Sequence, residues 1–317
     1  MLTLTDIESA AAVVYKQFQA TPQYRWALSS QRLGTDCWMK HENHTPVGAF
    51  KIRGGLTYFE ALKSKGSLPK EVISATRGNH GQSIAWAARA SGVACTIVVP
   101  LNNSVEKNAA MRALGVTLIE HGDDFQAARE FAIRLATERA AHMVPSFHTD
   151  LIRGVATYWW EFFKAVPTMD VAYVPIGMGS GAASAIAAKL ALNLPVKIVG
   201  VVSSHATAYA DSIAAGRVVE APATTELADG MACRLPDQAA LDILAPHIDH
   251  IVKVSDAEVA QAMRDIYADT HNVAEGAGAA SFAAAMQERT PLRGKVVGTT
   301  LCGGNVDSAV FARVLAS

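Results

Sequence analysis

The sequence predicts an α/β protein built on two open, twisted parallel sheets, and three observations lead to this fold class. Short apolar runs alternate with segments of helical periodicity along most of the chain. Glycines gather in loops that follow several of the predicted strands. The chain has 317 residues, of which 50% are hydrophobic and 18% charged, so it can bury a sizeable core and form two domains. Strands and helices that alternate at this spacing favour parallel sheets covered by helices.

In the first half of the chain, apolar periodicity predicts helices and short β-branched runs predict strands. Helices are expected over residues 3–19, 54–65, 80–91, 104–114 and 125–140, and strands over 37–40, 72–74, 94–100 and 117–120. Thr5 is a candidate N-cap of the first helix, because a threonine hydroxyl can accept a backbone hydrogen bond there.

The second half continues the alternation and suggests where the domains divide. Strands are expected over residues 171–176, 196–202 and 295–301, and helices over 182–190, 256–269 and 308–316. We predict a small domain over residues 66–148 and a large domain formed by 1–65 and 152–317. Ligands of such folds bind beyond the carboxyl ends of the strands, where this chain carries its glycines.

Charge and composition exclude some classes of binding partner and location. The net charge is −1 and no basic stripe is present, so nucleic acid and anionic membranes are not expected to bind. No run of about 18 apolar residues could span a membrane, and residues 1–20 lack a signal-peptide pattern. The four cysteines are far apart and form no C-x-x-C pair, which indicates reduced thiols and a cytoplasmic protein.

The segment around Lys51 is the strongest single indication of chemistry. Lys51 follows Phe50 and is flanked by Gly48 and Gly54. Glycines allow a cofactor to approach the backbone, and an aromatic ring can shield one side of it. A lysine amine in such a place can lose its proton and form a Schiff base. The alternative is a surface lysine whose stem covers apolar groups.

Two glycine loops join a predicted strand to a predicted helix. In residues 74–82, backbone N–H groups at the helix N-terminus could bind a carboxylate; a tight polar turn is the alternative. In residues 174–181, the glycines could hold a phosphate or the pyrophosphate of a dinucleotide. A dinucleotide site needs an acidic residue about 20 positions further on, and Ser203, Ser204 and His205 occupy that region instead.

A third turn, residues 301–305, follows the last predicted strand. Its glycines would allow a ring to approach, and Cys302 could offer a neutral partner to a heteroatom. A buried structural cysteine is the alternative reading of this turn.

Together these four segments resemble the pyridoxal-phosphate enzymes of fold type II, the tryptophan-synthase-β type, and within it the serine/threonine dehydratase family. The resemblance runs from Thr21 to Asn305 in the family's order. It implies pyridoxal 5′-phosphate as the cofactor and a homodimer as the assembly. By this resemblance Lys51 binds the cofactor as a Schiff base, Phe50 packs beside the ring and Asn79 bonds its 3′-oxygen.

The resemblance also assigns the other site residues. Cys302 stands at the pyridine nitrogen and Glu275 lies near the ring. The phosphate-binding residues are Gly177, Met178, Gly179, Ser180 and Gly181. The substrate-binding residues, in the carboxylate loop, are Thr76, Arg77, Gly78, Asn79 and His80. A divalent cation, Mg²⁺ or Ca²⁺, is expected at Glu226 and Asp229, since oxygen ligands suit these ions.

The implied activity is that of an ammonia-lyase: dehydration and deamination of an L-β-hydroxy-α-amino acid to a 2-oxo acid and ammonia. Lys51 would remove the Cα proton. A thiol at the ring nitrogen leaves a weaker electron sink, which suits elimination. Serine, threonine, 3-hydroxyaspartate and phenylserine all carry the reacting atoms. The alternatives are a racemase, a β-replacement enzyme and a non-catalytic protein on the same fold.

The chain departs from the family at Arg77, where relatives carry a small residue. In serine racemases that residue is a serine that acts as a second base, so its absence disfavours racemisation. Arg77 could pair with a second substrate carboxylate, or with an acidic side chain of the protein.

Overall fold

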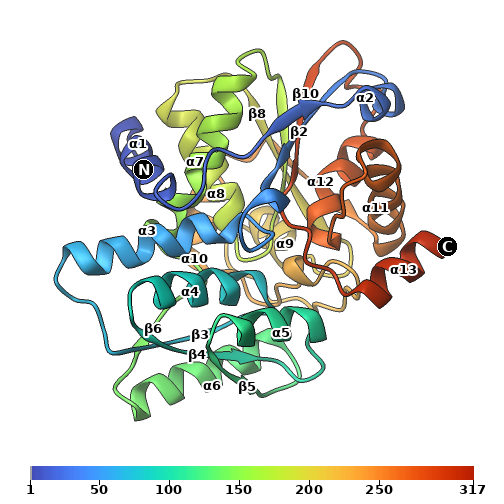
Figure 1. Ribbon diagram of the computed structural model, residues 1–317. Coiled ribbons are helices and arrows are strands. Elements are labelled where there is room, and N and C mark those ends of the chain that lie inside the picture. The colour runs from blue at the N-terminus through green and yellow to red at the C-terminus, as the bar shows by residue number, and fades with distance from the viewer. Residues whose placement is uncertain (1) are drawn as a thin grey trace.

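The fold consists of a six-stranded and a four-stranded sheet, each covered by helices (Figure 1). It is seen in a computed structural model that describes residues 2–317. The large sheet has the order β1-β2-β10-β7-β8-β9 and the small sheet the order β5-β4-β3-β6. The strands are β1 (Gln23–Arg25), β2 (Asp36–His41), β3 (Glu71–Ala75), β4 (Ala94–Val99), β5 (Thr117–Glu120), β6 (His142–Met143), β7 (Val171–Pro175), β8 (Lys197–Ser203), β9 (His250–Val254) and β10 (Val296–Leu301).

Helices occupy most of the segments between strands. They are α1 (Leu4–Val14), α2 (Ala27–Leu33), α3 (Lys51–Ser64), α4 (Asn79–Ala90), α5 (Val105–Ala113), α6 (Phe125–Glu138), α7 (Thr149–Ala165), α8 (Ser180–Ala191), α9 (Ala208–Ala215), α10 (Gln238–Leu244), α11 (Asp256–Thr270), α12 (Gly276–Gln287) and α13 (Ser308–Ala316). Two short 3₁₀ turns, η1 (Glu42–His44) and η2 (Asp229–Met231), lie in loops. In the part of the chain that the structure describes, no helix is long and apolar enough to cross a membrane.

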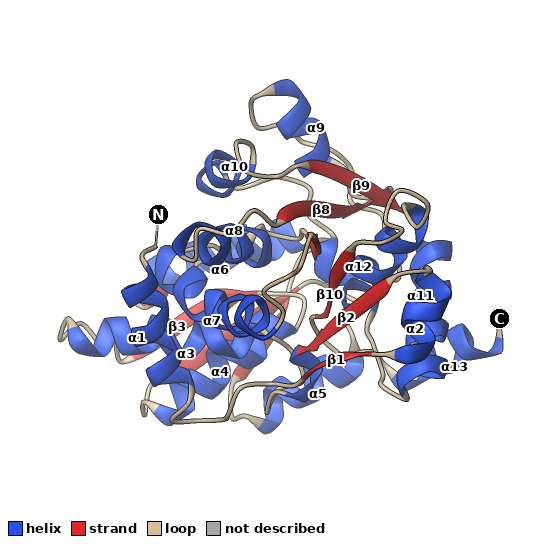
Figure 2. Ribbon diagram, turned by 90° about the horizontal axis from the view of Figure 1, so that it is seen from above, coloured by secondary structure: helices blue, strands red, loops and turns tan. Residues whose placement is uncertain are grey.

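The two sheets are parallel except at one edge. Only β1 pairs antiparallel, with β2; the remaining pairs in both sheets are parallel. Parallel strands need crossovers, and the helices that supply them cover both faces of the large sheet. One apolar cluster lies between that sheet and α11 and α12, and another lies between it and α7 and α8 (Figure 2). The predicted α/β class with two parallel sheets is confirmed.

The structure corrects details of the prediction. The first helix begins at Leu4 and ends at Val14, and its N-cap is Thr3, whose hydroxyl accepts a bond from Asp6 N at 3.2 Å, so Thr5 was the wrong cap. The helix expected from residue 54 begins at Lys51. The strands of the small sheet fall within residues 71–143, while the domain limits at 66–148 stay a prediction.

The fold brings separate loops to one place. The carboxyl ends of β3, β7 and β10 lead into the segments around residues 76–79, 176–179 and 302–305, and β2 leads toward Lys51. Because the segments after parallel strands emerge at one edge of a sheet, those of the large sheet converge, and the loop after β3 faces them from the small sheet.

Candidate active site

Backbone pairing between two distant segments fixes the position of Lys51. Phe50 N donates to Cys302 O at 3.0 Å, and Gly304 N donates to Gly48 O at 2.9 Å. Gly48 has a φ of +67°, a conformation that glycine adopts without strain. The chain then enters α3, with Lys51 as its first helical residue. The turn after β10 therefore aims the lysine side chain into the site.

The Lys51 amine lies against the N-terminus of another helix. Its Nζ donates to Ser180 Oγ at 2.6 Å, and Ser180 is the first residue of α8. Burial lowers the pKa of Lys51 to about 8, an effect that nearby Cys302 partly opposes. An amine with such a pKa is unprotonated in a useful fraction of molecules near neutral pH, as a nucleophile or base requires.

The loop between β7 and α8 forms a cradle of backbone donors. The first N–H groups of α8 have no partner within the helix, and the helix dipole favours an anion there. Gly179 has a φ of +89°, and a Cβ at Gly177 would run into the carbonyl oxygen of Gly230. Tyr209 OH donates to Met178 O at 3.1 Å and fixes the loop from behind. This loop can hold a phosphate by its backbone, with Ser180 adding a hydroxyl.

The loop between β3 and α4 forms a second donor group. Thr76 Oγ1 accepts bonds from Gly78 N at 2.8 Å and Gly81 N at 3.2 Å, which curls the loop. Asn79 and His80 open α4, so their N–H groups have no partner within the helix. Two helix N-termini, those of α4 and α8, thus line the same pocket as Lys51.

A buried polar network links Asn79 to charged groups. Asn79 Nδ2 donates to Glu275 Oε1 at 2.5 Å, and Asn305 Nδ2 donates to Asn79 Oδ1 at 2.9 Å. Lys107 Nζ lies 3.0 Å from Glu275 Oε2 and 2.7 Å from Asp229 Oδ2. Burial raises the pKa of Glu275, although Lys107 acts in the opposite direction. The network holds the Asn79 amide in one orientation toward the pocket.

Cys302 and His80 are buried and neutral. Burial, reinforced by Glu275, raises the pKa of the Cys302 thiol, whose Sγ lies 3.5 Å from Ala277 O. Burial, followed by the charge of Lys51, lowers the pKa of His80 to about 3. The Nε2 atom of His80 has no hydrogen-bond partner within the described part of the chain. Neither side chain brings a charge to the site at neutral pH.

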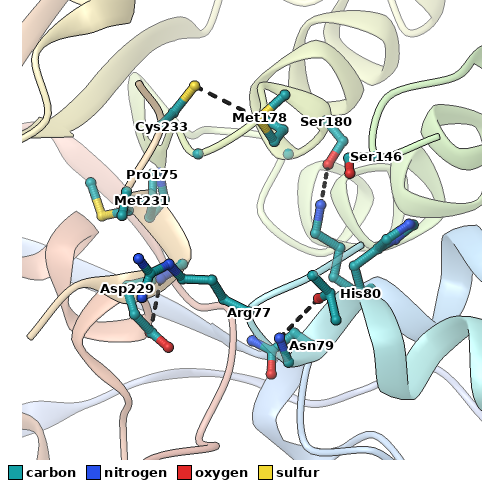
Figure 3. Close-up of a pocket in the computed structure, with 18 of the residues that line it drawn as sticks. Arg77, Asn79, His80, Ser146, Pro175, Met178, Ser180, Asp229, Met231 and Cys233 are labelled. Carbon is teal, nitrogen blue, oxygen red and sulfur yellow. Dashed lines mark hydrogen bonds between the residues drawn. The ribbon is translucent and has the colours of Figure 1, made fainter. Parts of the chain in front are cut away.

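One pocket collects most of the predicted site residues (Figure 3). Its empty space, including the part open to solvent, is about 850 Å³. Figure 3 shows Arg77 and Asn79 facing Met178 and Cys233 across it. The predicted residues on its wall are Phe50, Lys51, Thr76, Arg77, Gly78, Asn79, His80, Gly177, Met178, Gly179, Ser180, Gly181, Asp229, Glu275 and Cys302.

Sequence reasoning missed several residues on the same wall. Lys107, Phe125, Ser146, Met231 and Cys233 also line the pocket. Lys107 lies in the first turn of α5, and only the folded structure brings it next to Asp229 and Glu275. No local pattern marks such a residue; for Cys233, its place shortly after the 226–230 turn was the one available signal.

The two residues predicted to bind a cation, Glu226 and Asp229, have different surroundings. Glu226 is exposed, and its N–H donates to Asp256 Oδ2 at 2.9 Å. Asp229 instead faces Lys107 in the pocket. Among residues 2–317, no group of three or more His, Cys, Asp or Glu side chains is arranged to hold a metal ion. A Mg²⁺ or Ca²⁺ site stays a prediction.

The pocket fits the cofactor that the resemblance implies. A largely buried lysine with a lowered pKa stands beside a backbone cradle suited to a phosphate. Lys51, Ser180 and the N–H groups of α8 would hold the two ends of pyridoxal phosphate. A ring between them would have the thiol of Cys302 and the amide of Asn79 within the same pocket wall.

Comparison with known proteins agrees with this geometry. A family model described as pyridoxal-phosphate dependent enzyme matches residues 14–303. L-threonine ammonia-lyase of Thermotoga maritima is 30% identical over 316 residues, which covers 99% of this chain and 78% of the relative. L-threo-3-hydroxyaspartate ammonia-lyase of Saccharomyces cerevisiae is 29% identical over 314 residues, covering 99% of this chain and 96% of the relative.

A solved structure shares the fold over almost the whole chain. The processed form of threonine deaminase isoform 2 from Solanum lycopersicum superimposes with a TM-score of 0.90 at 27% identity, covering 99% of this chain and 91% of that one. This likeness confirms the predicted fold type II architecture. The chain therefore belongs to the family of pyridoxal-phosphate-dependent enzymes.

Proposed function

We propose that the protein is an ammonia-lyase that dehydrates an L-β-hydroxy-α-amino acid and releases a 2-oxo acid and ammonia. The observation that carries this proposal is the Lys51 amine, with its lowered pKa, 2.6 Å from the hydroxyl that opens α8. The relatives named as L-threonine and L-threo-3-hydroxyaspartate ammonia-lyases support the same reaction class.

Each residue has a role that follows from its position. The N–H groups of Asn79 and His80 bind the carboxylate of the amino acid at the N-terminus of α4. Lys51 accepts the Cα proton, since a base with a pKa near the working pH transfers protons most effectively. Ser180 Oγ keeps the amine directed into the pocket. When bound, pyridoxal phosphate supplies the electron sink that stabilises negative charge at Cα.

The uncharged side chain of Cys302 favours elimination. Cys302 stays a neutral thiol, because burial raises its pKa. A neutral partner gives the cofactor a weaker pull on electrons than a carboxylate would, and loss of the β-hydroxyl then competes well. The amino acid loses its Cα proton and its β-hydroxyl, the resulting enamine becomes an imine, and water converts the imine to the 2-oxo acid and ammonia.

The direct test is 2-oxo acid release by the purified protein from L-serine, L-threonine, L-threo-3-hydroxyaspartate and L-threo-phenylserine. We expect release from at least one of them, and none from Lys51→Ala, which should also lack the near-visible absorbance of the bound cofactor. D-serine formation without oxo acid would identify a racemase instead. Product formation from O-acetylserine and sulfide would identify a β-replacement enzyme.

Other features of the organisation are also proposals. We propose a homodimer in the cytoplasm, with a small domain over residues 66–148 and a large domain formed by 1–65 and 152–317. Family resemblance supports the dimer, and the four free cysteines are compatible with a reducing compartment. A divalent cation at Glu226 and Asp229 is tested by chelation: loss of activity or of thermal stability that Mg²⁺ or Ca²⁺ restores would support it.

A further inference from the structure

Arg77 is a cation in the pocket that has no charged partner among the residues that the structure describes. It is half-buried, and no carboxylate among residues 2–317 lies within ion-pair distance of its guanidinium. Its Nε is buried and makes no hydrogen bond to the described residues. A guanidinium keeps its positive charge in a protein. A nearby anion would therefore stabilise it where water is excluded.

The other cations of the pocket differ from Arg77 in this respect. Lys107 is compensated by Asp229 at 2.7 Å and by Glu275 at 3.0 Å. Lys51 sheds its charge more readily, because burial lowers its pKa. Arg77 alone among these three has neither a carboxylate nor a neutral form. The positive charge of Arg77 is therefore available to bind a ligand that carries a negative group.

The position of Arg77 indicates which part of a ligand it meets. Its backbone belongs to the loop whose N–H groups suit the α-carboxylate of an amino acid. Its side chain extends from that loop toward the wall that carries Asp229 and Met231 (Figure 3). It also borders a recess lined by Phe125, Met178 and Cys233. The guanidinium thus lies in the same pocket as the α-carboxylate cradle but extends away from it, toward the opposite wall.

We propose that Arg77 binds a second carboxylate, attached to the β-carbon of the substrate, and selects 2-amino-3-hydroxy dicarboxylic acids. This inference rests on the proposed function. A guanidinium can donate two parallel hydrogen bonds to a carboxylate, which adds geometric selection to charge. With 3-hydroxyaspartate, the Cα–H and Cβ–O bonds break and water leaves. A water molecule then hydrolyses the resulting imine, which releases ammonia and the 2-oxo dicarboxylic acid.

The test compares kcat/KM for L-threo-3-hydroxyaspartate with that for L-serine and L-threonine. Wild-type protein should prefer the dicarboxylate, and Arg77→Met should lower its kcat/KM by about 100-fold or more, because a buried ionic recognition site discriminates strongly. The values for serine and threonine should fall by a much smaller factor, since neither carries a second carboxylate. Arg77→Lys keeps the charge without the planar guanidinium. Its kcat/KM for the dicarboxylate should lie between those of the wild type and Arg77→Met.

Arg234→Met is the matched control. Arg234 also borders the recess, but it is paired with Glu220 at 2.9 Å and with Asp124 at 3.1 Å. Its loss should leave the preference for the dicarboxylate unchanged. Cofactor occupancy of every variant is checked by its absorbance before the kinetics are measured.

A binding measurement separates failure of this inference from failure of the proposed function. L-aspartate has the second carboxylate but no hydroxyl to lose, and L-alanine has neither; both are titrated by the change in cofactor absorbance. Weaker binding of L-aspartate alone in Arg77→Met supports the role of Arg77 even if no substrate yields oxo acid. Equal losses for all ligands, or a wild-type enzyme that turns over serine or threonine without preference for the dicarboxylate, would overturn it.

Discussion

Lys51 illustrates how position alone changes the chemistry of a side chain. It opens α3, and its amine lies beside the N-terminus of α8, where partial positive charge accumulates. Burial accounts for most of the lowered pKa. The protein therefore destabilises the charged form of the lysine, and that cost to folding can be measured in the cofactor-free protein.

Cofactor-free Lys51→Met should be more stable than cofactor-free wild type at pH 7, by up to about 3 kcal/mol of unfolding free energy. The folded protein protonates Lys51 with a pKa of about 8, against 10.5 as the reference value. The stability that the wild type loses relative to Lys51→Met is thus greatest below about pH 8, and the difference decreases as the pH rises toward 10.5. Urea unfolding from pH 7 to 10.5 measures it; equal stabilities throughout would contradict the account.

The residues that sequence could identify are those held in local patterns. Phe50-Lys51, the Asn79 loop, the Gly177 loop and Cys302 each combine a reactive or small residue with neighbouring glycines, and the structure gathers them in one pocket. Lys107 had no such pattern, because its partners are 122 residues away at Asp229 and farther still at Glu275. Arg77 could be identified from sequence, but only the structure shows that no carboxylate of residues 2–317 neutralises it.

At the scale of elements, two helices begin where an anion is expected. A glycine with an unusual backbone precedes each helix: Gly78, with a φ of +149°, before α4 and Gly179, with a φ of +89°, before α8. Gly78 also leaves room for Lys107, whose Cδ lies 2.5 Å from where a Cβ would stand. A Cβ at Gly179 would likewise crowd Ala240 and Tyr209, so a side chain at either position would disturb the start of its helix.

Gly177→Ala tests the phosphate loop as an element. The added methyl would overlap the carbonyl oxygen of Gly230, a backbone atom that cannot move aside easily, so the β7–α8 loop must shift. We expect the dissociation constant of pyridoxal phosphate to rise by about tenfold or more, since the loop donors lose their alignment. Fluorescence titration of the cofactor-free protein measures this constant.

Ser255→Ala is the control for simple loss of stability. Ser255 caps α11 in a capping box with Glu258, so its replacement should cost about 1 kcal/mol. The affinity for the cofactor should not change in that variant. If Gly177→Ala binds the cofactor as tightly as wild type, the loop does not hold the phosphate.

Most of the elements that sequence could predict had a clear period, although α7 has one too and was not among the predicted helices. α12 escaped because it is buried over residues 276–285 and rich in alanine, so it has no polar face to create a period. β9 escaped because only Val252 and Val254 are buried, and two positions make a weak alternation. β1 has three residues and β6 has two, too few for any pattern.

At the scale of the whole molecule, α5 ties the small sheet to the large one across the pocket. Lys107 pairs with Asp229 and Glu275, which belong to the other side. One residue earlier, Glu106 Oε1 accepts bonds from Ser308 N at 2.8 Å and Ser308 Oγ at 2.6 Å. Lys107, Asp229 and Glu275 line the pocket, so the contacts of α5 couple the arrangement of the two sheets to the site.

Lys107→Met should destabilise the protein by about 3 kcal/mol or more, because it leaves the buried Glu275 carboxylate without a counter-charge. Lys197→Met is the matched control. Lys197 pairs with Asp249 at 2.9 Å but is 61% exposed, so its loss should cost at most about 1 kcal/mol. Urea unfolding compares the two. A Lys107→Met protein no less stable than Lys197→Met would remove the link between the sheets from the account.

The proposed chemistry requires that Lys51 be the residue that holds the cofactor. Borohydride reduction of the purified protein, followed by peptide mass spectrometry, tests this claim directly, because reduction makes a lysine–cofactor bond permanent. We expect the mass of the reduced cofactor on the peptide that contains Lys51. Attachment to Lys107 or to another lysine, or no attachment in a protein that carries the cofactor's absorbance, would contradict the account.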